Sequence, residues 1–203
     1  MSLLLTVALV QMLAVVSPGP SFLITARMAV ARSRLDGVKV ALGLGAGTVL
    51  WSTAAVLGLH TIFAQVPWLY LAMKLGGALF LIYIAIEILR HAQAPLDLAD
   101  AAAVTARPFT TGFLTQITNP KVVVFFGSIF IALLPAEVPL WLSLSLIALV
   151  SFNEVWWYSA VAVFFSIPAV RQRYIALKAL IDRIVGVFLA ALALKLIWDA
   201  LVT

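Results

Sequence analysis

Long apolar stretches recur along this chain, and they decide what it can fold into. A helix that crosses a bilayer needs about 20 mainly apolar residues. Charged residues make up 10% of the chain, against about 25% in a typical soluble domain. The sequence therefore predicts an all-α membrane protein with six transmembrane helices. We place them at Leu3–Met28, Val38–Phe63, Trp68–Leu89, Phe109–Leu134, Leu140–Phe165 and Ala179–Leu201.

The composition excludes several classes of function. The chain has no cysteine and two histidines, His60 and His91, which argues against disulfides, thiolate metal sites and histidine-based metal sites. We therefore expect no metal and no cofactor. The net charge of +5 is explained by basic loops beside the membrane, so it does not predict a nucleic-acid partner.

The basic residues also predict an orientation. Ten of the thirteen Lys and Arg residues fall in the first, third and fifth loops, which share one side of a six-span protein. Loops rich in Lys and Arg stay in the cytoplasm. Both termini are therefore predicted to lie outside. The ten residues are Arg27, Arg32, Arg34, Lys39, Arg90, Arg107, Arg171, Arg173, Lys178 and Arg183.

The two halves of the chain carry similar interruptions. Ser17-Pro18-Gly19-Pro20 interrupts the first apolar stretch, and Thr118-Asn119-Pro120-Lys121 interrupts the fourth at a similar place. Three spans per half is an odd number, so the second half would be inverted in the membrane. We expect a first three-helix repeat at 1–93, a cytoplasmic linker at 94–107 and an inverted repeat at 108–203. Inverted repeats with broken helices are a recurring architecture of secondary transporters.

Each interruption is predicted to start a new half-helix inside the membrane. Proline lacks an N–H and breaks a helix, and Ser17 before Pro18 resembles an N-cap before the first helical residue, as does Asn119 before Pro120. A helix start has free N–H groups and a positive partial charge, which attract an anion such as a carboxylate. Packing kinks without a ligand are the alternative.

Two charged residues lie deep in the apolar stretches. Helix rise places Pro18, Lys121 and Glu154 in one layer, about 20–22 Å below the outer surface. A charge at such depth is costly. Lys121 and Glu154 therefore predict either a polar cavity or a mutual ion pair. The Gly43-x-x-x-Gly47 spacing permits a close helix approach, either within the chain or in a dimer.

These motifs together resemble the lysine exporter and homoserine/threonine resistance (LysE/RhtB) family of bacterial amino-acid efflux proteins. The resemblance rests on Ser17 to Pro20, the Gly43-x-x-x-Gly47 helix, Gln116 to Lys121, and Glu154-x-x-Trp157. Two positions depart from the family pattern. Ser21 stands where the family often has Asp or Asn, and Glu154 stands where it usually has Asp.

The resemblance implies a transporter in the bacterial cytoplasmic membrane that exports amino acids or related small metabolites in exchange for protons. Glu154 is then the expected proton-coupling residue. The expected partners besides the amino-acid substrate are membrane lipid and, in a homodimer, a second copy of the chain. The expected substrate-binding residues are Ser17, Pro18, Gly19, Pro20, Ser21, Asn119, Pro120, Lys121, Glu154 and Trp157.

Other functions remain open on the sequence. A channel or carrier for another small solute or ion is one alternative, and a non-transport membrane assembly subunit is another. A membrane-embedded enzyme is disfavoured because the deep apolar stretches offer no histidine or cysteine cluster.

Overall fold

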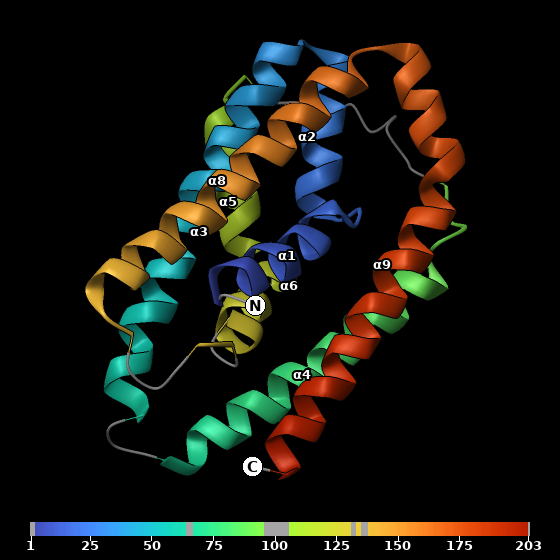
Figure 1. The fold of residues 1–203 in the computed structure, drawn as a ribbon. Helices are drawn as coiled ribbons and strands as arrows, with labels where there is room; N and C mark the ends of the chain where they lie inside the picture. Colours follow the sequence, from blue (N-terminus) through green and yellow to red (C-terminus); the bar gives the residue numbers. More distant parts are fainter. Residues whose placement is uncertain (1–2, 64–66, 96–105, 131–132, 135–137, 203) are drawn as a thin grey trace.

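The computed structural model describes residues 3–63, 67–95, 106–130, 133–134 and 138–202, and within these ranges it contains helices and no strands. Figure 1 shows their arrangement. The first half of the chain forms α1 (Leu3–Val16), α2 (Pro20–Ala31), α3 (Arg34–Phe63) and α4 (Pro67–Arg90). The second half forms α5 (Pro108–Thr118), α6 (Pro120–Val124), the π-helix η2 (Phe125–Phe130), α8 (Leu140–Phe165) and α9 (Pro168–Val202).

The observed helices follow the predicted stretches closely in the middle of the chain. Helix α8 has the predicted bounds, and α4 extends one residue further at each end. Helix α9 is the exception, because it begins at Pro168 rather than at Ala179. Its first turns carry Arg171 and Arg173, and hydropathy detects the apolar part of a helix rather than its full length. Most of the predicted linker lies outside the described residues.

The first and fourth stretches are broken where the sequence predicts. The axes of α1 and α2 meet at an angle of 58° across the segment from Ser17 to Gly19. Helix α5 ends at Thr118, and α6 begins at Pro120. Both breaks follow from proline, which removes a backbone donor and clashes with the preceding turn.

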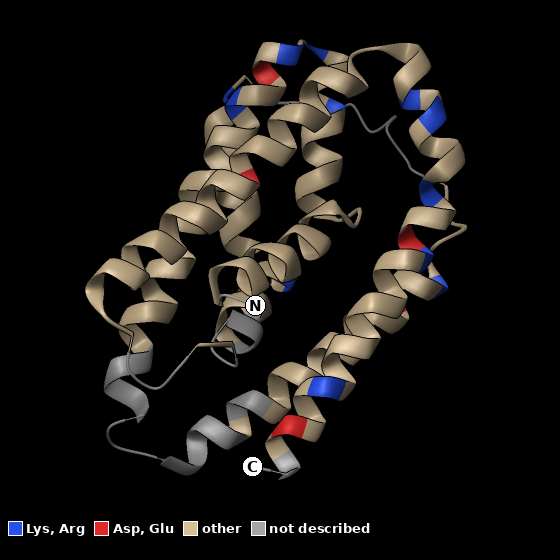
Figure 2. Ribbon diagram, viewed as in Figure 1, with Lys and Arg blue, Asp and Glu red and all other residues tan. Residues whose placement is uncertain are grey.

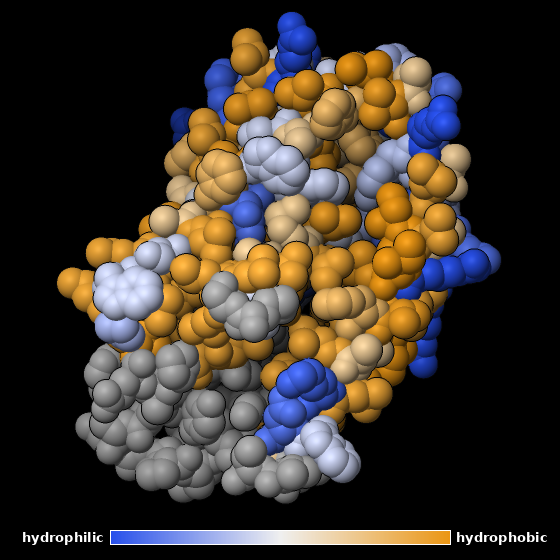
Figure 3. Space-filling view, in the orientation of Figure 1, coloured by the Kyte–Doolittle hydropathy of each residue, from blue (hydrophilic) through white to orange (hydrophobic). Residues whose placement is uncertain are grey.

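The molecule is a multi-pass helical membrane protein. Among the described helices, Arg34–Gly58 and Leu140–Phe165 are long and apolar enough to cross a membrane, and the bent pair α1–α2 makes a third candidate span. Large apolar side chains lie on the surface of these helices, such as Leu57, Trp141 and Phe152. Figure 3 shows a broad hydrophobic face across the middle of the molecule, as a lipid-facing surface requires.

The helices form two packed groups. Helix α3 packs against α5 and α8, with α2 alongside, whereas α4 packs against α9. Figure 1 shows α4 and α9 running side by side, apart from the α3, α5 and α8 group. Helix α1 and η2 fill the space between the groups, because α1 contacts α8 and α9, and η2 contacts α4 and α3.

Glycines bring α3 into backbone contact with its neighbours. A Cβ atom on Gly43 would overlap the carbonyl oxygen of Phe109 on α5, and one on Gly112 would overlap that of Val40 on α3. A Cβ on Gly47 would lie 2.7 Å from the Cβ of Gln116. The Gly43-x-x-x-Gly47 face is therefore used within the chain, which decides between the two possibilities left open by the sequence.

This contact generates a test of packing. We expect Gly43→Ala and Gly112→Ala each to lower the free energy of unfolding by about 1–3 kcal/mol, because two helix backbones must separate. Gly58→Ala on α3 is the matched control, since nothing lies within 4 Å of its added Cβ. Thermal unfolding of the purified variants in detergent measures the difference. Equal stability of Gly43→Ala and Gly58→Ala would contradict the close approach.

Candidate functional site

The two helix breaks lie next to each other, and the helices that begin after them, α2 and α6, have different N-caps. Asn119 caps α6, because its Oδ1 accepts a hydrogen bond of 3.0 Å from the backbone N–H of Lys121. Helix α2 begins later than predicted, with Gly19 as N-cap and Pro20 as the first helical residue. The prediction of Ser17 and Pro18 as the start of α2 is therefore wrong.

The capping matters for anion binding. The cap of α6 already uses the N–H of Lys121, and the N–H of Val122 donates to the carbonyl of Asn119. Gly19 offers α2 no side-chain cap and Pro20 has no N–H. The N–H groups of Ser21 and Phe22 are therefore the ones in its first turn that can bind an anion. Of the two predicted anion-binding helix starts, the geometry favours the one at α2.

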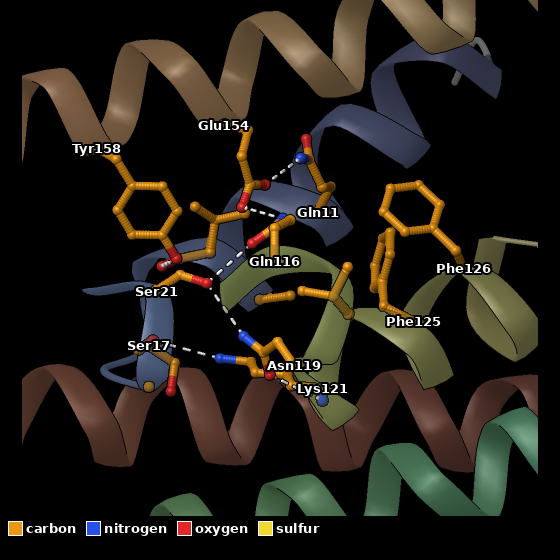
Figure 4. Close-up of a pocket in the computed structure, with 14 residues that line it drawn as sticks. Gln11, Ser17, Ser21, Gln116, Asn119, Lys121, Phe125, Phe126, Glu154 and Tyr158 are labelled. Carbon is orange, nitrogen blue, oxygen red and sulfur yellow. Dashed lines mark hydrogen bonds between the residues drawn. The ribbon is translucent and has the colours of Figure 1, made fainter. Parts of the chain in front are cut away.

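Glu154 is the centre of a buried hydrogen-bond network. The residue is 4% exposed, and its two carboxylate oxygens accept hydrogen bonds from different spans. Gln11 on α1 donates from Nε2 to Oε2 over 3.1 Å, and Gln116 on α5 donates from Nε2 to Oε1 over 2.7 Å. Figure 4 shows both amides pointing toward the carboxyl group. The network therefore joins α1, α5 and α8 around one carboxylate.

The network extends from Gln116 to the α6 cap. Ser21 on α2 donates to Oε1 of Gln116 over 2.9 Å and accepts a 3.0 Å hydrogen bond from Nδ2 of Asn119. Ser21 stands at the position where the family that the sequence resembles often has Asp or Asn. Its hydroxyl group can both donate and accept, so it connects Gln116 to Asn119 without adding a charge.

Lys121 does not pair directly with Glu154. In the described part of the chain, its Nζ donates to the carbonyl oxygen of Ser17 over 3.3 Å. An ammonium group has three donors. The predicted alternative of a mutual ion pair is therefore wrong, and Lys121 retains donors that a ligand can use. The hydroxyl group of Ser17, 2% exposed, has no hydrogen-bond partner among the described residues.

Two cavities adjoin at the breaks. The smaller has a volume of about 30 Å³ and contains Glu154, Lys121, Ser17 and Tyr158 in its wall. It has room for about one or two water molecules. Phe125 and Phe126 of η2 bound it on one side, with ring centroids 5.1 Å apart (Figure 4).

The larger cavity has a volume of about 500 Å³ and lies between the breaks and the α4–α9 pair. Lys121 lines it as well, so its ammonium group stands where the two cavities meet. The wall also contains Glu87 of α4, His91 in the turn after α4, and Lys178 and Asp182 of α9. No group of three or more His, Asp or Glu residues that could hold a metal ion occurs in the ranges that the structure describes.

Nine of the ten predicted site residues line one or both cavities. Ser17, Gly19, Asn119 and Lys121 line both. Ser21 and Glu154 line the smaller one, and the three prolines line the larger one: Pro18, Pro20 and Pro120. Trp157 lines neither of these cavities. It packs against the apolar cluster formed by α1, α2, α3 and α8.

Sequence reasoning missed several residues of the site. Gln11 is a lone amide in an apolar stretch, and this polarity was the available signal. Gln116 belongs to the quoted motif but was given no role. Tyr158 follows Trp157 directly, so only the helix orientation separates them. Lys178 directly precedes the predicted sixth span, and Asp182 lies in its first turn. Charged residues at the end of a span are expected to face water rather than a cavity.

Comparison with known proteins finds one matching family model and several relatives of similar length. The description "LysE type translocator" belongs to a family model that matches residues 12–200. A threonine efflux protein of Salmonella typhimurium is 34% identical over 97% of this chain and 98% of its own length. A threonine efflux protein of Escherichia coli K12 is 34% identical over 96% and 97%.

A leucine efflux protein of Salmonella choleraesuis is 28% identical over 62% of this chain and 60% of its own length. No solved structure matches the chain. Since the family model covers nearly all of the sequence and the threonine efflux proteins match it almost from end to end, the chain belongs to the LysE type translocator family.

Proposed function

We propose that this translocator exports a small zwitterionic amino acid from the cytoplasm in exchange for protons. The observation that carries the proposal is the pair of unlike charges, Lys121 and Glu154, which line one buried cavity without binding each other. Such an arrangement suits a cycle in which an amino acid and a proton occupy the site in turn. Lys121 binds the substrate carboxylate, and Glu154 binds the proton.

The helix packing supports an architecture of two inverted repeats with six spans. Counterpart helices pack against each other, since α3 contacts α8 and α4 contacts α9. The broken pairs α1–α2 and α5–α6 also correspond, and both contribute to the same cavities. In transporters built this way, substrate sites lie at the interface between repeats. The first repeat takes residues 1–93 and the second takes residues 108–203.

The named relatives support the substrate class. Threonine and leucine, the amino acids in their names, are zwitterions with uncharged side chains. The threonine efflux proteins match over a longer part of the chain at a higher identity, so L-threonine is the first substrate to test. Counterflow of labelled L-threonine into proteoliposomes tests the proposal directly. A parent protein that exchanges none of the twenty protein amino acids contradicts it.

A channel is a weaker candidate for the same chain. The smaller cavity has room for only about one or two waters, and Phe125 and Phe126 of η2 border it. This geometry therefore does not favour a continuous water-filled path.

A homodimer is not part of the proposal, because the Gly43-x-x-x-Gly47 face packs within the chain.

Lys121→Met tests the carboxylate-binding role. We expect the variant to fold but to bind the exchanged amino acid about 10- to 100-fold more weakly, as the loss of a charged hydrogen bond predicts. Binding to the purified protein by calorimetry measures this change. Lys195→Met on exposed α9 surface is the control, and it should bind as the parent does. Parent-like binding by Lys121→Met would assign Lys121 a purely structural role.

Glu154→Gln tests proton coupling. The amide keeps the size of the side chain but cannot exchange a proton, so we expect transport driven by a pH gradient to be lost. Counterflow without a gradient should persist in part. Glu154→Asp should restore part of the response, since it retains the carboxyl group. The measurement is uptake into inverted vesicles with an imposed pH difference. A Glu154→Gln protein that responds to the gradient like the parent would remove Glu154 from the coupling step.

The charge distribution supports a cytoplasmic position for the basic end. Figure 2 shows Lys and Arg gathered around the α2–α3 turn and the first turns of α9. Loops with excess Lys and Arg stay in the cytoplasm. The larger cavity is lined by the last turns of α4 and the first half of α9, so in this orientation it faces the cytoplasm, where an exporter loads its substrate. Both termini then lie outside.

Single cysteines test this orientation without background, because the chain contains none. We expect a cysteine at Ser33, in the α2–α3 turn, to resist an impermeant thiol reagent in intact cells. A cysteine at Leu140, which is 74% exposed at the start of α8, should react. Both should react once the membrane is permeabilised. Labelling of Ser33→Cys in intact cells would reverse the proposed orientation.

A further inference from the structure

Asp182 carries a buried carboxylate oxygen without a partner. The residue is 3% exposed, and its Oδ1 has no hydrogen-bond donor among the described residues. An unsatisfied buried acceptor of this kind costs free energy, more so when it is charged. Asp182 also lines the larger cavity. Its unpartnered oxygen therefore belongs to a residue of the cavity wall.

Lys178 fixes the position of this carboxylate. Its Nζ donates to Oδ2 of Asp182 over 2.9 Å and to the carbonyl oxygens of His91 and Ala92 over 3.0 and 3.2 Å. Three acceptors use the three donors of an ammonium group. Lys178 therefore binds the turn that follows α4 and one oxygen of Asp182. It leaves the other oxygen, Oδ1, to a second donor.

The larger cavity thus has a cation and an anion in its wall, each with unused capacity. Lys121 supplies the positive group at the breaks, and Asp182 supplies the negative group on α9. Glu87, the other described carboxylate there, has a 36% exposed side chain and lies 3.4 Å from the His91 ring. Glu87 is partly exposed and has a neighbour, whereas Asp182 Oδ1 is buried and has no hydrogen-bond partner among the described residues.

We propose that Lys121 and Asp182 form a loading site for the zwitterionic substrate in the larger cavity. The carboxylate binds Lys121, and the ammonium group donates to Oδ1 of Asp182. Glu154 lies in the smaller cavity, which has room for about one or two waters, so an amino acid in this conformation meets Asp182 first. The inference rests on the proposed amino-acid export and adds a second carboxylate, with a role separate from proton coupling.

Asp182→Asn is the first test. Counterflow with each of the twenty protein amino acids identifies the best substrate of the parent, and calorimetry then measures its binding. We expect Asp182→Asn to weaken binding about ten-fold or more, as the loss of one charge-assisted hydrogen bond predicts. Asp182→Glu, which retains the charge, should recover part of the affinity. The pH-gradient response of Asp182→Asn at saturating substrate should persist, since Glu154 is intact.

Asp199→Asn is the matched control. Asp199 also pairs with a lysine four residues earlier on α9, Lys195, but on the exposed surface. It should leave binding unchanged. If Asp182→Asn fails to fold because Lys178 loses its partner, the variant Lys178→Met with Asp182→Asn removes both charges together and should show the same weakening.

The outcomes separate the two proposals. A parent that exchanges no amino acid ends the proposed function and this inference with it. A parent that exchanges an amino acid, together with parent-like affinity in Asp182→Asn or in the double variant, overturns the loading site alone. Weakened affinity in Asp182→Asn that Asp182→Glu does not relieve also overturns it, because the effect then does not depend on the charge.

Discussion

The buried carboxylate of Glu154 is the interaction on which the rest of the site depends. A carboxylate placed deep in a membrane protein is stable only if its oxygens receive hydrogen bonds. Gln11 and Gln116 supply them from α1 and α5, the first segments of the two broken spans. Satisfying one charge therefore draws both broken spans against α8. The chain of hydrogen bonds continues through Ser21 to Asn119, which caps the first turn of α6 at the N–H of Lys121.

Much of the fold could be predicted because its determinants are local. Apolar length gives the bounds of α3, α4 and α8 within a few residues, and proline gives the two breaks. The error at α2 has a local cause as well. Both Ser17 and Gly19 precede a proline, and a residue in that position disfavours helical geometry. Gly19 adopts an extended conformation, so the helix begins at the second proline, Pro20, instead of at the first.

The candidate site could be predicted only in part, because its partners meet through tertiary packing. The motifs identify Lys121, Asn119 and Glu154, which line the smaller cavity together. They do not reveal that Lys121 binds the Ser17 carbonyl rather than Glu154. Trp157 and Tyr158 are a second example of a difference that the sequence does not reveal. They are adjacent in sequence, and only the rotation of α8 about its axis decides which one reaches the cavity.

The glycine contacts have a mechanical consequence for any transport cycle. A contact between two backbones cannot adjust through a change of side-chain rotamer. We therefore expect α3 and α5 to move together as one rigid unit. Gly186 brings α9 close to α4, since its added Cβ would lie 2.7 Å from Cγ of the Leu89 side chain and 3.3 Å from the carbonyl oxygen of Ala85. The larger cavity lies between these two groups of helices, lined by the breaks on one side and by α4 and α9 on the other. A change in the angle between these two groups of helices would therefore change the volume of the cavity.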